Sequence, residues 1–102
     1  MAFKTLKQEA QEFLGNVTEE YAFRAVNGHV LLNEKDLAEE LKTMSEGDYQ
    51  YHANAEKNDF STWVKDCIKD ETLVRDLARA PNKTQAARAA ASRITLLSKR
   101  LG

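Results

Sequence analysis

Between Tyr49 and Trp63 the chain reads YQYHANAEKNDFSTW, and this segment decides the fold. It gathers two tyrosines, a histidine, two asparagines and the only tryptophan into fifteen residues. Most of the remaining sequence has the spacing of ordinary amphipathic helices. A specific structure or site is therefore expected here.

The first half of this segment alternates. Tyr49, Tyr51 and Ala53 fall on one side of an extended chain, and Gln50 and His52 fall on the other. Alternation with a period of two is typical of a half-buried strand. The pattern predicts a strand over residues 48–53.

The second half predicts a helix that begins at Asn58 or Asp59, because both residue types cap helix starts. Phe60 and Trp63 begin a stripe with the spacing i, i+3, i+4, i+7, i+8, which continues through Val64, Cys67 and Ile68. This stripe predicts that Phe60 and Trp63 anchor the helix in the core.

Upstream, residues 3–14 have one apolar helical face. Residues 19–26 and 29–32 read as short strands around Asn27-Gly28, a pair that favours a hairpin turn because both residues tolerate positive φ. A helix capped by Asn33 follows and extends to Met44.

Downstream, Asp70 is expected to cap a short helix that Pro81 stops, and an alanine-rich helix follows over about 83–101. The sequence therefore predicts an α+β fold: a small three-stranded sheet, made of the hairpin plus one strand, packed against several helices, with a long C-terminal helix.

The 102 residues are of a size for one domain, with 42% hydrophobic and 30% charged residues. Charge is unevenly distributed along it. Residues 1–80 form an acidic α+β body with ten Lys or Arg against sixteen Asp or Glu, a net charge of −6. Residues 82–102 form the basic, Ala-rich helix, and from residue 81 onward the chain has five basic and no acidic residues. Such a basic end is expected to contact its own acidic body, an acidic partner or nucleic acid.

No apolar run is long enough for a membrane span, and the N-terminus lacks the apolar stretch of a signal peptide. The single cysteine, Cys67, cannot form an internal disulfide. These features favour a cytoplasmic setting without a membrane partner.

Recognisable parts for catalysis are missing from the sequence. There are two histidines and one cysteine, with no Cys-x-x-Cys, His-Glu-x-x-His, EF-hand or Gly-rich phosphate motif. Cys67 belongs to the apolar stripe, where a cysteine is normally inert. The sequence therefore predicts no enzyme activity, no metal site and no cofactor.

The run Tyr51-His52-x-Asn54, followed by Lys57-Asn58-Asp59-Phe60-x-x-Trp63, resembles a small domain family of archaea and bacteria that has no assigned function. The resemblance covers roughly residues 20–80. It implies a hairpin and a Leu-rich helix upstream of the motif, but no activity.

Two interpretations of this motif are open. In the structural one, the polar side chains form a clasp between strand and helix, with Asp59 as a cap; its members are His52, Asn54, Asn58 and Asp59. In the functional one, His52 carries a proton, Lys57 meets an anion and Tyr49 or Tyr51 stacks on a ring. That alternative predicts a site for a small anionic ligand at His52, Asn54, Lys57, Asn58 and Tyr51.

The basic helix also allows several interpretations. Three are open: the helix docks on the body with its arginines paired to acids, it contacts nucleic-acid phosphates, or it self-associates through its alanine face. The candidate contact residues are Lys83, Arg88, Arg93, Lys99 and Arg100. We expect a non-enzymatic interaction module that binds a protein partner or itself through this helix. Nucleic-acid association through the same helix is the first alternative, and an anionic-ligand sensor at residues 52–63 is the second.

Overall fold

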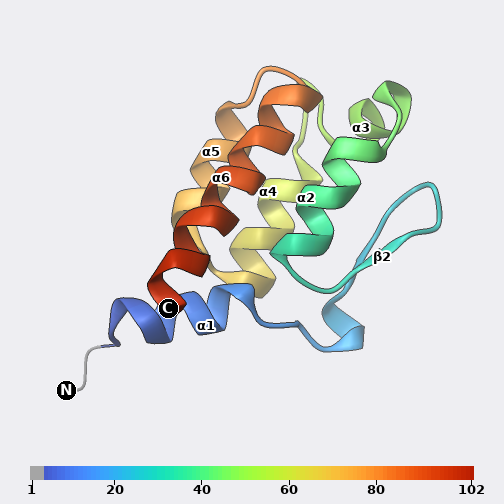
Figure 1. The fold of residues 1–102 in the computed structure, drawn as a ribbon. Coiled ribbons are helices and arrows are strands. Elements are labelled where there is room, and N and C mark those ends of the chain that lie inside the picture. Colours follow the sequence, from blue (N-terminus) through green and yellow to red (C-terminus); the bar gives the residue numbers. More distant parts are fainter. Residues whose placement is uncertain (1–3) are drawn as a thin grey trace.

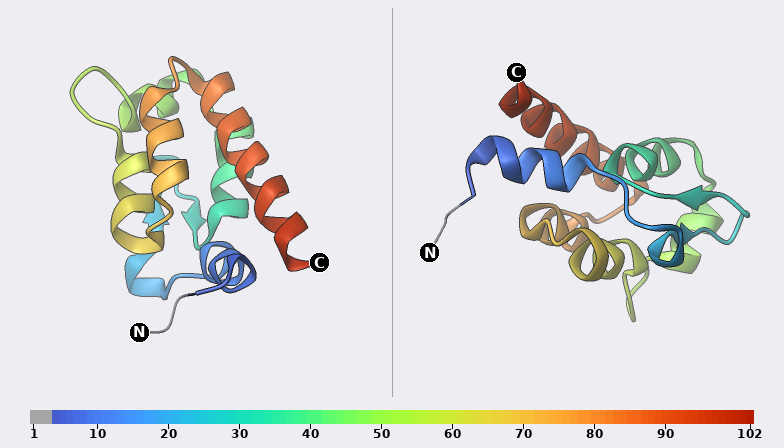
Figure 2. Two further views of the ribbon diagram at one scale, coloured as in Figure 1. Left: turned by 90° about the vertical axis from the view of Figure 1, so that its left-hand side faces the viewer. Right: turned by 90° about the horizontal axis from the view of Figure 1, so that it is seen from below.

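The computed structural model describes residues 4–102. Helices α2, α4, α5 and α6 run side by side, α1 crosses one end of them, and a hairpin lies beside α2 (Figure 1; Figure 2). The helices are α1 (Leu6–Leu14), α2 (Glu34–Thr43), α3 (Glu46–His52), α4 (Asp59–Trp63), α5 (Glu71–Arg79) and α6 (Lys83–Leu101). A 3₁₀ turn, η1 (Glu19–Tyr21), precedes the hairpin, and a π-helical turn, η2 (Val64–Ile68), follows α4.

The hairpin is confirmed, but its strands are shorter than the predicted ranges 19–26 and 29–32, since residues 19–21 form the 3₁₀ turn η1. β1 (Phe23–Arg24) pairs antiparallel with β2 (Val30–Leu31), and Gly28 in the turn has a φ of 94°. The carboxylate of Glu40 in α2 holds the turn, since it accepts hydrogen bonds from Asn27 Nδ2 at 2.8 Å and contacts His29 Nδ1 at 2.7 Å.

The third strand predicted over residues 48–53 is wrong: residues 46–52 form helix α3. Ser45 caps this helix by accepting a hydrogen bond from the Asp48 amide. Tyr49, His52 and Ala53 are all buried, at the helical spacing i, i+3, i+4. The alternation is misleading because His52, counted as polar, belongs to the buried face. In the described part of the chain the sheet has two strands, and an isolated bridge joins Ala53 to Asn58.

The predicted helix starts are confirmed at Asn33, Asn58 and Asp70, whose side chains each accept from a backbone amide two or three residues into the helix. The first helix begins at Leu6, and residue 3 of its predicted range lies outside the described residues. The C-terminal helix has the predicted range.

Phe60 and Trp63 lie in the core at 1% and 7% exposure. Phe60 stacks on Phe23 and Tyr49, and Trp63 Nε1 donates to the Tyr21 carbonyl at 2.7 Å. The aromatic cluster thus joins the hairpin, α3 and α4. Helix α6 closes the other side of the core with Ala86, Ala90 and Leu97.

Candidate functional site

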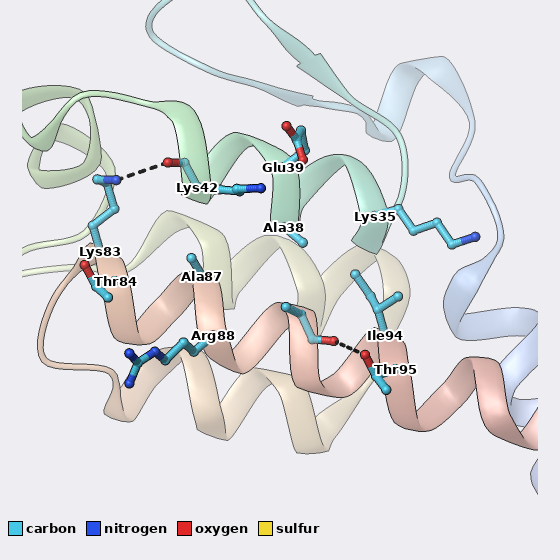
Figure 3. A pocket seen from close by; sticks show the side chains of 11 residues that line it. Lys35, Ala38, Glu39, Lys42, Lys83, Thr84, Ala87, Arg88, Ile94 and Thr95 are labelled. Carbon is cyan, nitrogen blue, oxygen red and sulfur yellow. Dashed lines mark hydrogen bonds between the residues drawn. The ribbon is translucent and has the colours of Figure 1, made fainter.

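A groove of about 650 Å³ lies on the surface between α2 and α6 (Figure 3). Its floor is made of small and apolar side chains: Ala38 from α2, and Ala87, Ala91 and Ile94 from α6. Small residues occur there because α2 and α6 pack directly against one another. The result is a shallow apolar trough that follows the two helices.

Cations surround this trough. Lys35 and Lys42 extend from α2 and Arg88 from α6, while Glu39 is the one acidic residue in the lining. Within residues 4–102, Lys35, Lys42 and Arg88 take part in no ion pair. The groove therefore combines apolar surface with three cations that form no ion pair within residues 4–102, beside the single carboxylate of Glu39.

Lys83 has a different role at one end of the groove. Its Nζ donates to the carbonyl oxygens of Leu41 and Lys42, each at 3.4 Å (Figure 3). These carbonyls belong to the last turn of α2, where a cation is favourable. Lys83 thus ties the start of α6 to the end of α2.

Arg93, a candidate contact residue, is 8% exposed and faces inward. Its Nε and Nη2 donate to the two carboxylate oxygens of Asp70, both at 2.9 Å, and its guanidinium lies 5.8 Å from the Phe13 ring centre. This bidentate pair connects α6 to the N-terminus of α5. Arg93 is therefore not on the contact surface. Lys99 is exposed and Arg100 half-buried, both beyond the end of the groove.

Glu34 joins this buried pair from α2. It is fully buried, and among residues 4–102 neither of its carboxylate oxygens has a hydrogen-bond partner. Burial and the neighbouring Asp70 carboxylate raise the pKa of Glu34 to about 9, although Arg93 acts in the opposite direction. A pKa in this range favours the protonated Glu34 carboxyl at neutral pH.

The corner, which we define as residues 52–59, holds most of the predicted ligand residues. His52 is 5% exposed and uses both ring nitrogens. The Val26 amide donates to Nε2 at 3.0 Å, so Nδ1 carries the proton that His52 donates to Asp59 Oδ2 at 2.9 Å. Neither nitrogen is left for a ligand.

The remaining side chains of the corner also bind their own chain. Asn54 donates to the Gln50 carbonyl and accepts from the Glu56 amide. Asn58 accepts from the Ser61 amide and donates to the Leu77 carbonyl. Lys57 pairs with Asp59 at 2.9 Å and lies 5.0 Å from the centre of the exposed Tyr51 ring. A hollow of about 560 Å³ adjoins this loop. The side-chain amides of Asn54 and Asn58 bind the backbone, and Lys57 binds Asp59, so these groups are already engaged within the chain.

Asp59 is the hub of the corner and is not its helix cap, which is Asn58. Partial burial raises the pKa of Asp59, but the hydrogen bonds from Lys57 and His52 and the Lys57 charge outweigh it. The net effect lowers the pKa of Asp59 below its usual range. This arrangement is the polar clasp of the structural interpretation.

Candidate groups for catalysis are few in the described structure. Cys67 is partly buried, and burial and the Asp66 charge raise the pKa of its thiol, which disfavours the reactive thiolate. Residues 4–102 contain no group of three His, Cys, Asp or Glu side chains placed to hold a metal ion. None of their helices has the length and apolarity needed to cross a membrane.

The sequence analysis did not predict that residues of α2 line the groove. Lys35, Ala38 and Lys42 have the spacing i, i+3, i+7, so their common helix face could be found. That this face lies beside Arg88 depends on the packing of two helices about fifty residues apart, which no local pattern encodes.

No protein-family model, no curated protein and no solved structure matches the chain. The resemblance of the corner motif to a prokaryotic domain family stays a prediction.

Proposed function

We propose that the chain is a non-enzymatic interaction module that binds a protein partner through the groove between α2 and α6. One observation carries the proposal: an apolar floor of alanines and Ile94 lies between Lys35, Lys42 and Arg88, which form no ion pair within residues 4–102. Apolar area supplies affinity on burial, and unpaired rim charges select and orient a partner.

A protein partner fits this surface better than nucleic acid does. Binding of single strands uses aromatic side chains on which bases stack, and the groove lining has none. One of the five basic candidates, Arg93, is occupied by Asp70. Phosphate contacts by Lys35, Lys42, Arg88 and Lys99 stay the alternative.

The ligand-sensor alternative has less support. Its proposed residues, apart from Tyr51, already hold hydrogen bonds or ion pairs within the chain. A ligand there would have to break these contacts before making its own, and each broken contact offsets part of the affinity.

Two adjacent positions on α6 give a matched test. Ala91 lines the groove, whereas Ser92 is exposed on the neighbouring face, and either can be changed to glutamate. Both variants place the same charge on the same helix, so their folded stability is expected to be similar.

The full chain is used as bait in a nuclease-treated extract of the cells that produce it. We expect a protein retained by wild type and Ser92→Glu and lost with Ala91→Glu. Retention that is equal for both variants, or that disappears on nuclease treatment, contradicts the proposal. Thermal melts of the two variants check that neither is unfolded.

A further inference from the structure

We infer that the occupant of the α2–α6 groove is an acidic amphipathic helix of another protein. The inference rests on the function proposed above and names the kind of partner. It follows from the backbone of the groove walls, the length of the groove and the position of its charges.

The walls of the groove favour a helical occupant. Both walls are helices, α2 and α6, whose backbone amides and carbonyls are bonded within each helix. An extended peptide gains affinity by pairing with a free strand edge, and helical walls provide no such edge. A helix satisfies its own backbone and needs only side-chain contacts, so it is the segment that can be buried here at low cost.

The length of the groove sets the size of this helix. On α6 the lining extends from Lys83 to Thr95, which is about 18 Å at 1.5 Å per residue. A helix of about three turns matches it. Because the floor is mostly alanine, the large apolar side chains must come from the partner, at positions such as i, i+3, i+4 and i+7.

The charges select the sign of the partner. Lys35 and Lys42 lie two helical turns apart on one rim, and Arg88 lies on the other. A partner helix with its apolar stripe on the floor would place its flanking side chains next to these cations. Acidic flanks gain charge pairs on both rims, whereas basic flanks meet these three cations and can pair only with Glu39 on the α2 rim.

A pair of synthetic 15-residue peptides tests the inference. Both carry leucine at the same i, i+3, i+4, i+7 positions; one has glutamate and the other lysine at the flanking positions. Binding to the full chain is followed by fluorescence anisotropy at low salt. We expect the acidic peptide to bind about tenfold or more tightly than the basic one, and to weaken as salt is added.

Three variants locate the effect. Ala91→Glu is expected to weaken the acidic peptide strongly, and Ser92→Glu to weaken it little. The double variant Lys42→Glu, Arg88→Glu should reverse the preference toward the basic peptide. This reversal requires a folded protein, so it also excludes loss of fold as the cause.

Equal binding of the two peptides, binding of neither, or a preference that the double variant leaves unchanged overturns the inference. A DNA duplex that binds more tightly than the acidic peptide and depends on the same residues overturns it in favour of nucleic acid. Self-association in sedimentation that Ala91→Glu abolishes overturns it in favour of a second copy. If the peptides fail while the cellular partner still depends on Ala91, the groove function stands and only the acidic helix is wrong.

Discussion

The corner and the α2–α6 groove are both rich in polar side chains, but the two regions use them in opposite ways. In the corner, His52, Asn54, Asn58 and Asp59 are engaged with the chain's own backbone and with each other. In the groove, Lys35, Lys42 and Arg88 have no ionic partner within residues 4–102.

The difference teaches how to separate structure from function in a small domain. Polar side chains that satisfy one another stabilise the fold and have little left for a ligand. Charged side chains that surround apolar surface and form no ion pair within the chain are available to a partner. Mutations in the corner should therefore change stability, and mutations in the groove should change binding.

The largest effect is expected at the aromatic anchor beside the corner. Trp63→Ala removes a buried ring and should lower the free energy of unfolding by about 3–5 kcal/mol, measured by urea denaturation. Trp63→Phe keeps most of the volume and loses the hydrogen bond to the Tyr21 carbonyl, so its cost should be about 1 kcal/mol. Similar costs for the two variants would contradict the anchor role.

Helix α2 contains both kinds of polar side chain, because Glu34 is buried in the core whereas Lys35 and Lys42 are exposed at the groove. The folded pKa of about 9 exceeds the unfolded value of 4.5, so the folded protein binds an extra proton between these values. Stability should then fall as pH rises from 4.5 to 9.

Glu34→Gln mimics the protonated carboxyl and should flatten this dependence. Urea denaturation of both proteins at several pH values from 5 to 9 provides the measurement. Parallel profiles for wild type and Glu34→Gln would show that Glu34 is ionised in the fold.

His52→Ala tests the clasp directly. It leaves the Val26 amide without its acceptor and Asp59 without one of its partners, at an expected cost of about 1–3 kcal/mol. The neighbouring exposed Tyr51→Ala serves as the control and should change stability little. If His52 only bound a ligand and had no structural role, both His52→Ala and Tyr51→Ala would melt like wild type.

Asn58→Ala and Asp59→Asn divide the clasp into two parts. Asn58→Ala removes the cap of α4 and should cost about 1 kcal/mol at every pH at which the protein is folded. Asp59 has a lowered folded pKa, so its contribution is complete above the ordinary value of 3.8 and is lost as pH falls through the lower folded value. The difference between wild type and Asp59→Asn should shrink in that acidic range. A difference that grows on acidification would reverse the sign assigned to Asp59.

The smallest effect on stability is expected in the groove. Lys42→Ala and Arg88→Ala remove exposed side chains without ion pairs and should change the free energy of unfolding by less than about 0.5 kcal/mol. The same variants should weaken partner binding. If Lys42→Ala destabilised the protein more than His52→Ala, the contrast between the two regions would be lost.

The sequence predicts elements that depend on neighbouring residues. Asn27-Gly28 marks the hairpin turn, Asn33 and Asp70 mark helix starts, and Phe60 with Trp63 marks a buried helix face, because each signal acts within a few residues. The prediction of a third strand was wrong because His52, counted as polar, is buried, and it shares one helical face with Tyr49 and Ala53.

Long-range pairing explains what the sequence does not predict. Arg93 pairs with Asp70 across 23 residues. Its spacing places it on the helix face of Ala90 and Leu97, away from the exposed Arg88, but no local signal identifies Asp70 as its partner. The groove likewise exists only once α2 and α6 are packed together. Both outcomes depend on helix packing and cannot be read from local spacing.

The most direct test of the contrast is an amide chemical-shift titration of the full, ¹⁵N-labelled chain with the acidic amphipathic peptide. We predict shifts that saturate and cluster at residues 35–42 and 84–95, while the amides of residues 52–59 stay in place. Shifts centred on residues 52–59, with the α2 and α6 amides unmoved, would contradict the assignment of the groove as the binding surface and the corner as structural.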